Sequence, residues 1–325
     1  MAEAILNAKT TQAITRKQKD TGIWGANMLA LAASAKDGIK DIGTVPQHRR
    51  LLQLGLSRSA RPFKLSERIL FRLLSRDDDP TLQFEYLKAV KDHPASGEWT
   101  REQFREAATA ALAEAGYQED PRIRGAAHKI ASNVSTFLRS PLADKPFIRV
   151  ATKTVLDPEA HPPTWYSLAM IAALPSLQRE RAGFIERLGQ YLAQPAPKKE
   201  YAVMLGKKAL KPNHLLLGDP IEADSKGNAK DIPVALYTIE LLAKLGALQS
   251  SPSGMKVLSR LVSECDERGI WQPKALKAQP KAGHPITYHW YPLMAETKAP
   301  ESRVIDVTFR LASIARLLGW QLTFA

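Results

Sequence analysis

Cysteine is almost missing from this chain of 325 residues, which holds a single one, Cys265. One cysteine excludes a disulfide within the chain and a zinc site built mainly of thiolates. Long apolar runs are missing as well, because no uncharged apolar stretch approaches the roughly 18 residues that a membrane span needs. The polar N-terminal stretch lacks the apolar core of a signal peptide. These absences predict a cytoplasmic protein without a membrane span.

The charge of the chain is one-sided. Its 46 Lys and Arg outnumber 33 Asp and Glu, which gives a net charge of +13 and a sequence pI of about 9.7. The surplus lies mostly at the two ends of the chain and forms no arginine-rich arm. Such a balance permits an acidic partner, nucleic acid or a phosphorylated small molecule as ligand.

Helical periodicity dominates the sequence. Residues 64–76 place leucine and isoleucine at steps of three and four, with charged residues on the opposite face. Residues 101–117 form an alanine-rich amphipathic helix, which we expect to begin after Thr100 and to end at Gly116. Residues 120–141 begin with Asp120 as cap and a proline in the first turn.

Signals for strands are scarce. Residues 144–156 are the best candidate for extended structure, and residues 213–233 are interrupted by glycine and proline, as in a long loop with a small hairpin. The fold class predicted from these patterns is all-α.

Two segments of the chain resemble each other in sequence. Residues 51–79 and 241–269 both read as the end of a helix, a Leu-Gly pair, a loop with Ser and Pro, and a second amphipathic helix. Helix-ending glycines recur at Gly55, Gly116, Gly246 and Gly319. A single helix pair could not bury its apolar stripe, whereas stacked pairs could. We therefore predict an irregular lead-in over residues 1–45 and one helical-repeat domain over residues 46–325.

Two stretches carry a family resemblance: GYQEDPRIRGAAHKI (116–130), and SECDERGIWQP with HPITYHWYPLM (263–273 and 284–294). They resemble the repeats of the prenyltransferase and squalene-cyclase superfamily, in which an Asp-Pro-Arg turn and an acidic–Gly–aromatic turn flank the helices. The resemblance implies an α/α toroid with a cavity at one end. An open HEAT-type solenoid shares much of the same signature. The acidic run at 77–79 matches neither aspartate motif of these enzymes, so no activity follows from the resemblance.

The stretch AGHPITYHWYPLMAE (282–296) concentrates histidine and aromatic residues in a chain of helix formers. In one interpretation these residues line the mouth of a toroid and enclose an apolar or cationic ligand. In the other, the aromatic side chains fill the gap between the first and last helix pairs. The candidate ligand-binding residues are His284, Tyr288, His289, Trp290, Tyr291, Trp271 and Asp306.

Two further groups are candidates for anion binding. His48, Arg49 and Arg50 lie at the start of a predicted helix, where backbone N–H groups add to their positive charge. Arg122, Arg124 and His128 lie within two turns of another helix. For the first group a solvated first turn of the helix is the favoured interpretation, and for the second it is pairing with acids on a neighbouring helix. The spacing of the histidines indicates no metal site.

Three functions remain open. The first is a helical-repeat binding or scaffold protein with a basic surface. The second is a cavity enzyme or carrier for an apolar or diphosphate-bearing small molecule, and the third is a HEAT-like nucleic-acid enzyme. The sequence names no cofactor, and fold alone cannot decide among these functions.

Substitution in the aromatic stretch separates its two interpretations. His289→Ala and Tyr291→Ala are expected to lower the melting temperature if the side chains fill a gap, because truncation leaves a cavity. Thermal unfolding and ligand binding measured on both variants check this. Unchanged stability with lost binding would show that the stretch is a ligand site.

Overall fold

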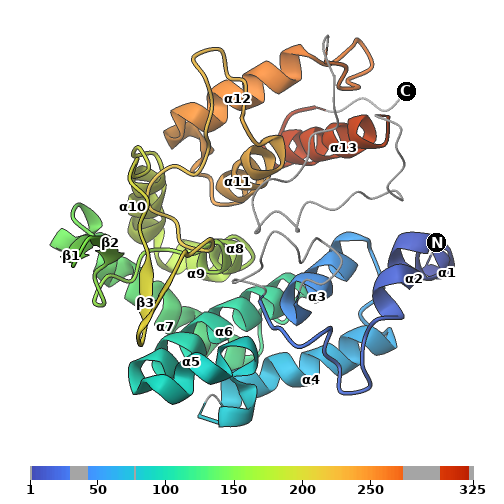
Figure 1. The fold of residues 1–325 in the computed structure, drawn as a ribbon. Helices are drawn as coiled ribbons and strands as arrows, with labels where there is room; N and C mark the ends of the chain where they lie inside the picture. The colour runs from blue at the N-terminus through green and yellow to red at the C-terminus, as the bar shows by residue number, and fades with distance from the viewer. Residues whose placement is uncertain (1, 30–42, 77, 274–300, 322–325) are drawn as a thin grey trace. The chain divides into compact units, whose positions relative to one another are not determined.

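The computed structural model describes residues 2–29, 43–76, 78–273 and 301–321. The chain divides into two compact units. Unit 1 comprises Met1–Glu180 and Pro197–Leu215, and unit 2 comprises Arg181–Ala196 and Leu216–Ala325. Helices make up most of each unit (Figure 1). The mostly helical class predicted from the sequence is confirmed, whereas the predicted single domain over 46–325 stays a prediction.

Unit 1 holds nine of the α-helices in the described residues, together with four short strands. The helices are α1 Ala2–Asn7, α2 Lys9–Thr15, α3 Thr44–Gln53, α4 Arg61–Ser75, α5 Leu87–Asp92, α6 Pro94–Glu114, α7 Pro121–Leu138, α8 Trp165–Ala172 and α9 Pro175–Glu180. Single 3-10 turns lie at Pro80–Leu82, Phe84–Tyr86 and Pro141–Ala143.

The strands form two antiparallel hairpins within the described part of unit 1. β1 (Phe147–Val150) pairs with β2 (Lys153–Leu156), and β3 (Val203–Leu205) pairs with β4 (Lys208–Leu210). A parallel bridge between Val155 and Ala202 joins the two hairpins. The extended structure predicted for residues 144–156 is confirmed.

Helix α6 lies at the centre of unit 1, where it packs against α3, α4, α5, α7 and α8. Its apolar face is fully buried at Ala108, Ala111 and Leu112, as the sequence predicted. Small side chains allow the neighbouring helices to approach closely, and α8 is buried along its whole length. One long helix therefore fixes the positions of five others.

Polar side chains link α3, α4 and α6 inside this core. The Arg49 guanidinium, which is 1% exposed, donates from Nη2 to Oε1 of Glu114 at 2.6 Å. His48 Nδ1 lies 2.9 Å from Ser66 Oγ, and burial is the main reason that the His48 pKa falls to about 3. Because charged groups are costly to bury alone, the Arg49–Glu114 pair holds α3 in register with α6.

Unit 2 contains α10 (Ala182–Leu192), α11 (Ile232–Lys244), α12 (Pro252–Ser263) and α13 (Glu301–Leu317), with a 3-10 turn at Leu248–Ser250. Helix α11 packs against both α12 and α13, and Arg310 of α13 forms an ion pair with Glu240 of α11 at 3.2 Å. Asp266 accepts hydrogen bonds from the backbone N–H groups of Arg268 and Ile270, so the predicted acidic turn before Trp271 is present.

The ends of the helices show which of the caps and helix-ending glycines predicted from the sequence are present in the structure. Gly55, Gly116, Gly246 and Gly319 all adopt positive φ after a helix, and Asp120 caps α7 ahead of Pro121, as predicted. The predicted start of α6 was wrong. The helix begins at Pro94 with His93 as its cap, and Thr100 lies inside it, where its hydroxyl donates to the Ser96 carbonyl at 2.7 Å.

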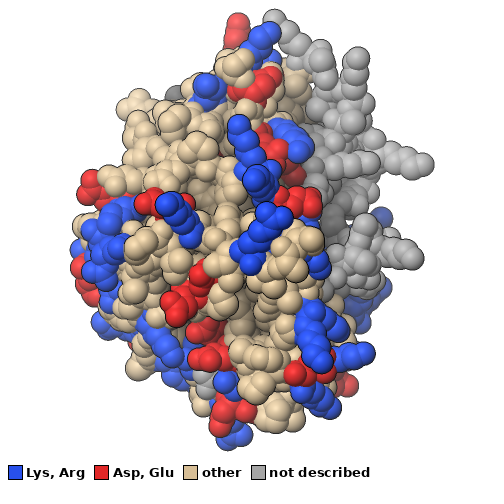
Figure 2. Space-filling view, turned by 60° about the vertical axis from the view of Figure 1, so that its left-hand side comes forward, with Lys and Arg blue, Asp and Glu red and all other residues tan. Residues whose placement is uncertain are grey.

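The surface mixes both signs of charge. Figure 2 shows Lys and Arg side chains interspersed with Asp and Glu over the face in view. Lys198, Lys199, Lys207 and Lys208, on and before the β3–β4 hairpin, are exposed. In the part of the chain that the structure describes, no helix has both the length and the apolar character to cross a membrane.

The buried ion pair gives a test of this packing. Glu114→Ala is expected to lower the free energy of unfolding by about 3 kcal/mol, because Arg49 would stay buried without its carboxylate. Asp20→Ala is the matched control, since Asp20 pairs with Arg61 where both side chains are largely exposed, and its loss should be below about 1 kcal/mol. Urea unfolding measures both. Equal losses would contradict the structural role of the buried pair.

Candidate functional site

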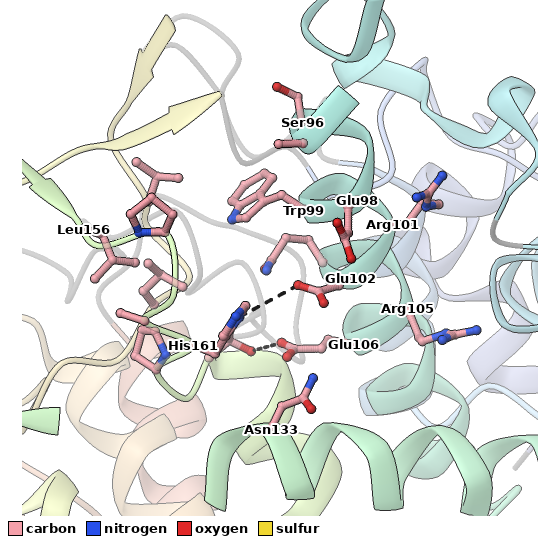
Figure 3. A pocket seen from close by; sticks show the side chains of 18 of the residues that line it. Ser96, Glu98, Trp99, Arg101, Glu102, Arg105, Glu106, Asn133, Leu156 and His161 are labelled. Carbon is pink, nitrogen blue, oxygen red and sulfur yellow. Dashed lines mark hydrogen bonds and ion pairs between the residues drawn. The ribbon is translucent and has the colours of Figure 1, made fainter. Parts of the chain in front are cut away.

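A cavity of about 610 Å³ lies in unit 1, and all of its lining residues belong to that unit. Its walls come from α6, α7, the segment between β2 and α8, and the β3–β4 hairpin (Figure 3). The volume is in the range of pockets that hold small organic molecules, roughly 300–1,000 Å³.

Helix α6 contributes a row of carboxylates to this cavity. Glu98, Glu102 and Glu106 are spaced four residues apart, so they lie along one side of the helix. The buried alanines of the same helix face the core. The helix is held at its start by His93, whose Nδ1 accepts the Ala95 N–H at 3.2 Å. One helix thus presents its acidic side to the cavity and its apolar side to the core.

Glu106, the last glutamate of this row, has a raised pKa. Burial raises the pKa of this half-buried carboxyl to about 7, and the negative charge of Glu102 acts in the same direction. A hydrogen bond from the Thr164 hydroxyl, at 2.6 Å from Oε2, opposes the shift by favouring the charged form. Glu106 therefore changes its protonation state near neutral pH.

The hydrogen bond from Thr164 influences which carboxyl oxygen of Glu106 carries the proton when the acid is neutral. Thr164 caps α8, and its Oγ1 accepts the backbone N–H groups of Tyr166 and Ser167 at 3.1 and 2.9 Å. These two bonds occupy both lone pairs of the hydroxyl, so its single hydrogen is left for Glu106 Oε2. Because the carbonyl oxygen of a carboxylic acid is a better acceptor than its hydroxyl oxygen, this bond favours the form of neutral Glu106 that carries its proton on Oε1.

The opposite wall carries His161. Its Nδ1 lies 3.9 Å from Oε2 of Glu102, and Figure 3 shows its ring directed towards the Glu102 and Glu106 carboxyl groups. Asn133 extends from α7 towards Glu106. Lys129 also lines the cavity. Carboxylates, an imidazole and an amide thus surround one end of the cavity.

The other end of the cavity is more apolar. Trp99 projects from α6 towards Leu156 (Figure 3), and Val203 and Met204 of β3 complete this wall. Trp99 is held between Tyr86 and His214 by edge-to-face contacts with ring centroids 5.7 and 5.6 Å apart. A ligand with an apolar part can therefore pack against a fixed aromatic ring.

Two buried polar atoms of the lining have no hydrogen-bond partner among the described residues. They are Ser96 Oγ and Gln103 Oε1, in side chains that are 1% and 6% exposed. Buried polar groups are normally paired, so ordered water is the partner expected at these two atoms.

The described residues contain no group of three His, Cys, Asp or Glu side chains arranged to hold a metal ion. The lining does contain acids and a histidine near each other, which are the residue types of proton-transfer sites. The arrangement can bind hydrogen-bond donors and exchange a proton at Glu106.

The candidate residues from the sequence lie elsewhere. His284, Tyr288, His289, Trp290 and Tyr291 fall outside the described residues. Trp271 and Asp306 are buried in unit 2, where the Trp271 indole donates to Glu264 at 2.9 Å.

The two anion-binding groups do not line the cavity either. His48 and Arg49 are buried in the core of unit 1, and Arg50 is partly buried beside them on α3. On α7, Arg122 pairs with Asp120 at 2.7 Å, Arg124 lies 3.8 Å from Glu119, and His128 lies 3.5 Å from Glu180. Arg49, Arg122, Arg124 and His128 thus have acidic partners within the chain.

Sequence reasoning missed Glu102, Glu106, His161 and Thr164. The available signal was the step of four between glutamates on an otherwise alanine-rich helix. Comparison of the chain with protein-family models, curated proteins and solved structures found no significant match.

The raised pKa of Glu106 predicts a change of stability with pH. A raised carboxyl pKa means that the folded state binds more protons than the unfolded state between about pH 4.5 and 7, so stability falls as the pH rises through this range. Glu106→Gln keeps an acceptor for Thr164 but has no charge. We expect it to stabilise the protein by roughly 1–2 kcal/mol near pH 8 and to have little effect near pH 5.

Thermal unfolding of both proteins at the two pH values measures this difference. A Glu106→Gln variant that is no more stable than the wild type near pH 8 would contradict the burial of the charge.

Proposed function

We propose that unit 1 binds a small organic molecule in the cavity beside α6, as a carrier or a cavity enzyme. The observation that carries the proposal is the cavity of about 610 Å³, which joins a carboxylate-lined end to an aromatic end. Pockets of this size with a few convergent polar groups and a perturbed pKa are the usual form of a ligand site.

The lining favours a different ligand from the diphosphate considered from the sequence. Arg101, Arg105 and Lys129 line the cavity as well, but the carboxyl groups of Glu102 and Glu106 at its polar end would repel a phosphate group there. The sequence also suggested an apolar small molecule, and this agrees with the wall formed by Trp99 and Leu156. We infer a ligand with an apolar part and a polar part rich in hydrogen-bond donors.

We also propose that the helix pairs stack as in an α/α toroid or a short HEAT-like solenoid. The support comes from consecutive helices that are joined at a glycine. Helices α3 and α4, α6 and α7, and α11 and α12 each flank a glycine with positive φ. The resemblance to prenyltransferase and squalene-cyclase repeats remains a prediction of fold and carries no activity.

A second candidate function is a scaffold that holds an acidic protein or nucleic acid. The exposed lysines on and before the β3–β4 hairpin favour it, because clustered cations attract polyanions. This function does not require the cavity, so the experiment below separates the two.

The proposal predicts that small molecules bind in the cavity and that filling the cavity stops them. Asn133→Trp places a large ring beside Glu106 from an exposed position of α7, whereas Thr136→Trp places the same ring on the same helix outside the cavity lining. A fragment library balanced among amines, neutral molecules and carboxylates is screened by saturation-transfer NMR.

Fragments are expected to bind the wild type and Thr136→Trp, and to lose at least about tenfold in affinity with Asn133→Trp, because the ring excludes them. Absence of any binding, or binding that both variants leave unchanged, would reject the cavity as a ligand site and favour the scaffold.

A further inference from the structure

We propose that the polar part of the ligand is a protonated amine, bound as an ammonium ion by Glu106, Glu102 and Asn133. This inference rests on the proposed function of the cavity and adds the chemical class of the ligand. It also implies that the ligand binds with release of a proton from the protein.

The first support is the number of open acceptors. Oε1 of Glu106 receives no hydrogen bond from any described residue, since the Thr164 hydroxyl is bound to Oε2. Asn133 makes no hydrogen bond within the described chain, so its side-chain carbonyl is open to a ligand. Together with the Glu102 carboxylate, these groups offer three acceptors to the three N–H donors of an ammonium group.

The second support is the charge of the lining. The lining holds four acidic residues and three basic ones, Arg101, Arg105 and Lys129, in a chain whose net charge is +13. The Arg101 and Arg105 side chains extend away from His161 (Figure 3), and Arg105 donates to the Leu74 carbonyl at 3.2 Å. The two arginines are therefore directed away from the acidic end.

Eight charged or titratable residues line the cavity besides Glu106. They are Glu98, Glu102, Arg101 and Arg105 on α6, His93 at its start, Lys129 on α7, and Asp157 and His161 on the facing segment. His161 and Lys129 are the cations that an ammonium group must displace or avoid. His161 lies 3.9 Å from Glu102, whereas no ion pair joins Glu98, Glu106 or Asp157 to a cation among the described residues.

The form of Glu106 that binds an ammonium ion is the carboxylate. In its favoured form, neutral Glu106 carries its proton on Oε1, where it would point an O–H donor at the N–H donors of the ligand. The carboxyl must therefore lose this proton before the amine binds. Since the pKa of free Glu106 is about 7, amine affinity should fall about tenfold for each pH unit below that value.

Three probes of similar shape test the ligand class: phenethylamine, phenethyl alcohol and phenylacetate. Each has an aromatic ring for the Trp99 wall and differs in the charge of its polar group. Near pH 8 we expect the amine to bind about ten to a hundred times more tightly than the alcohol, as charge-assisted hydrogen bonds allow. Phenylacetate is expected to bind most weakly. Isothermal titration near pH 8 compares the affinities. Amine titration near pH 6, in two buffers of different ionisation enthalpy, measures the released proton, because Glu106 is mostly protonated there before the amine binds.

Two variants assign the effect to Glu106. Glu106→Gln should reduce amine affinity at least about tenfold, leave the alcohol within about twofold and remove the pH dependence of amine binding. Glu159→Gln removes the same charge from an exposed position that does not line the cavity, and should leave all three affinities unchanged within about twofold.

The outcomes distinguish the proposal that the ligand is an amine from the more general proposal that the cavity binds a ligand. An alcohol that binds as tightly as the amine, or amine binding without proton release, overturns the amine assignment while the cavity remains a ligand site. Failure of all three probes to bind also overturns the assignment, and the fragment screen then decides independently whether the cavity binds anything. Tighter amine binding with release of a proton, both lost in Glu106→Gln, supports it.

Discussion

The hydroxyl of Thr164 has one hydrogen, and the chemistry of the site depends on where that hydrogen lies. Both of its lone pairs accept backbone N–H groups at the start of α8, so the hydrogen is directed to Oε2 of Glu106. The other oxygen of the carboxyl is then the favoured position for the proton of the neutral acid. A capping interaction that stabilises a helix therefore also orients an acid, and the two roles cannot be separated by simple deletion of Thr164.

Helix α6 connects this interaction to the rest of unit 1. Its alanines are buried against neighbouring helices, and its glutamates line the cavity. Glu114 at the end of the same helix pairs with the buried Arg49 of α3. Packing on one side of α6 thus determines how far Glu106 lies from Thr164 on the other, and the desolvation that raises the Glu106 pKa follows from that packing.

Local signals were readable from the sequence. Asp120 with Pro121, the helix-ending glycines and the strands over 144–156 depend on residues close together in the chain, and each was predicted. The start of α6 was missed because Thr100 has the composition of a cap, while the histidine that caps the helix is a rarer choice. The site could not be predicted because Thr164 and Glu106 are 58 residues apart and meet only through the packing of α8 on α6.

The protonation of Glu106 is the central claim, and carbon-13 NMR of the glutamate carboxyl groups measures it directly. A titration should give Glu106 a midpoint of about 7 in the free protein. Thr164→Val should raise this midpoint further, because it removes the hydrogen bond that favours the carboxylate, whereas Thr164→Ser should leave it nearly unchanged. A midpoint near the ordinary glutamate value of 4.5 in the wild type would contradict the account.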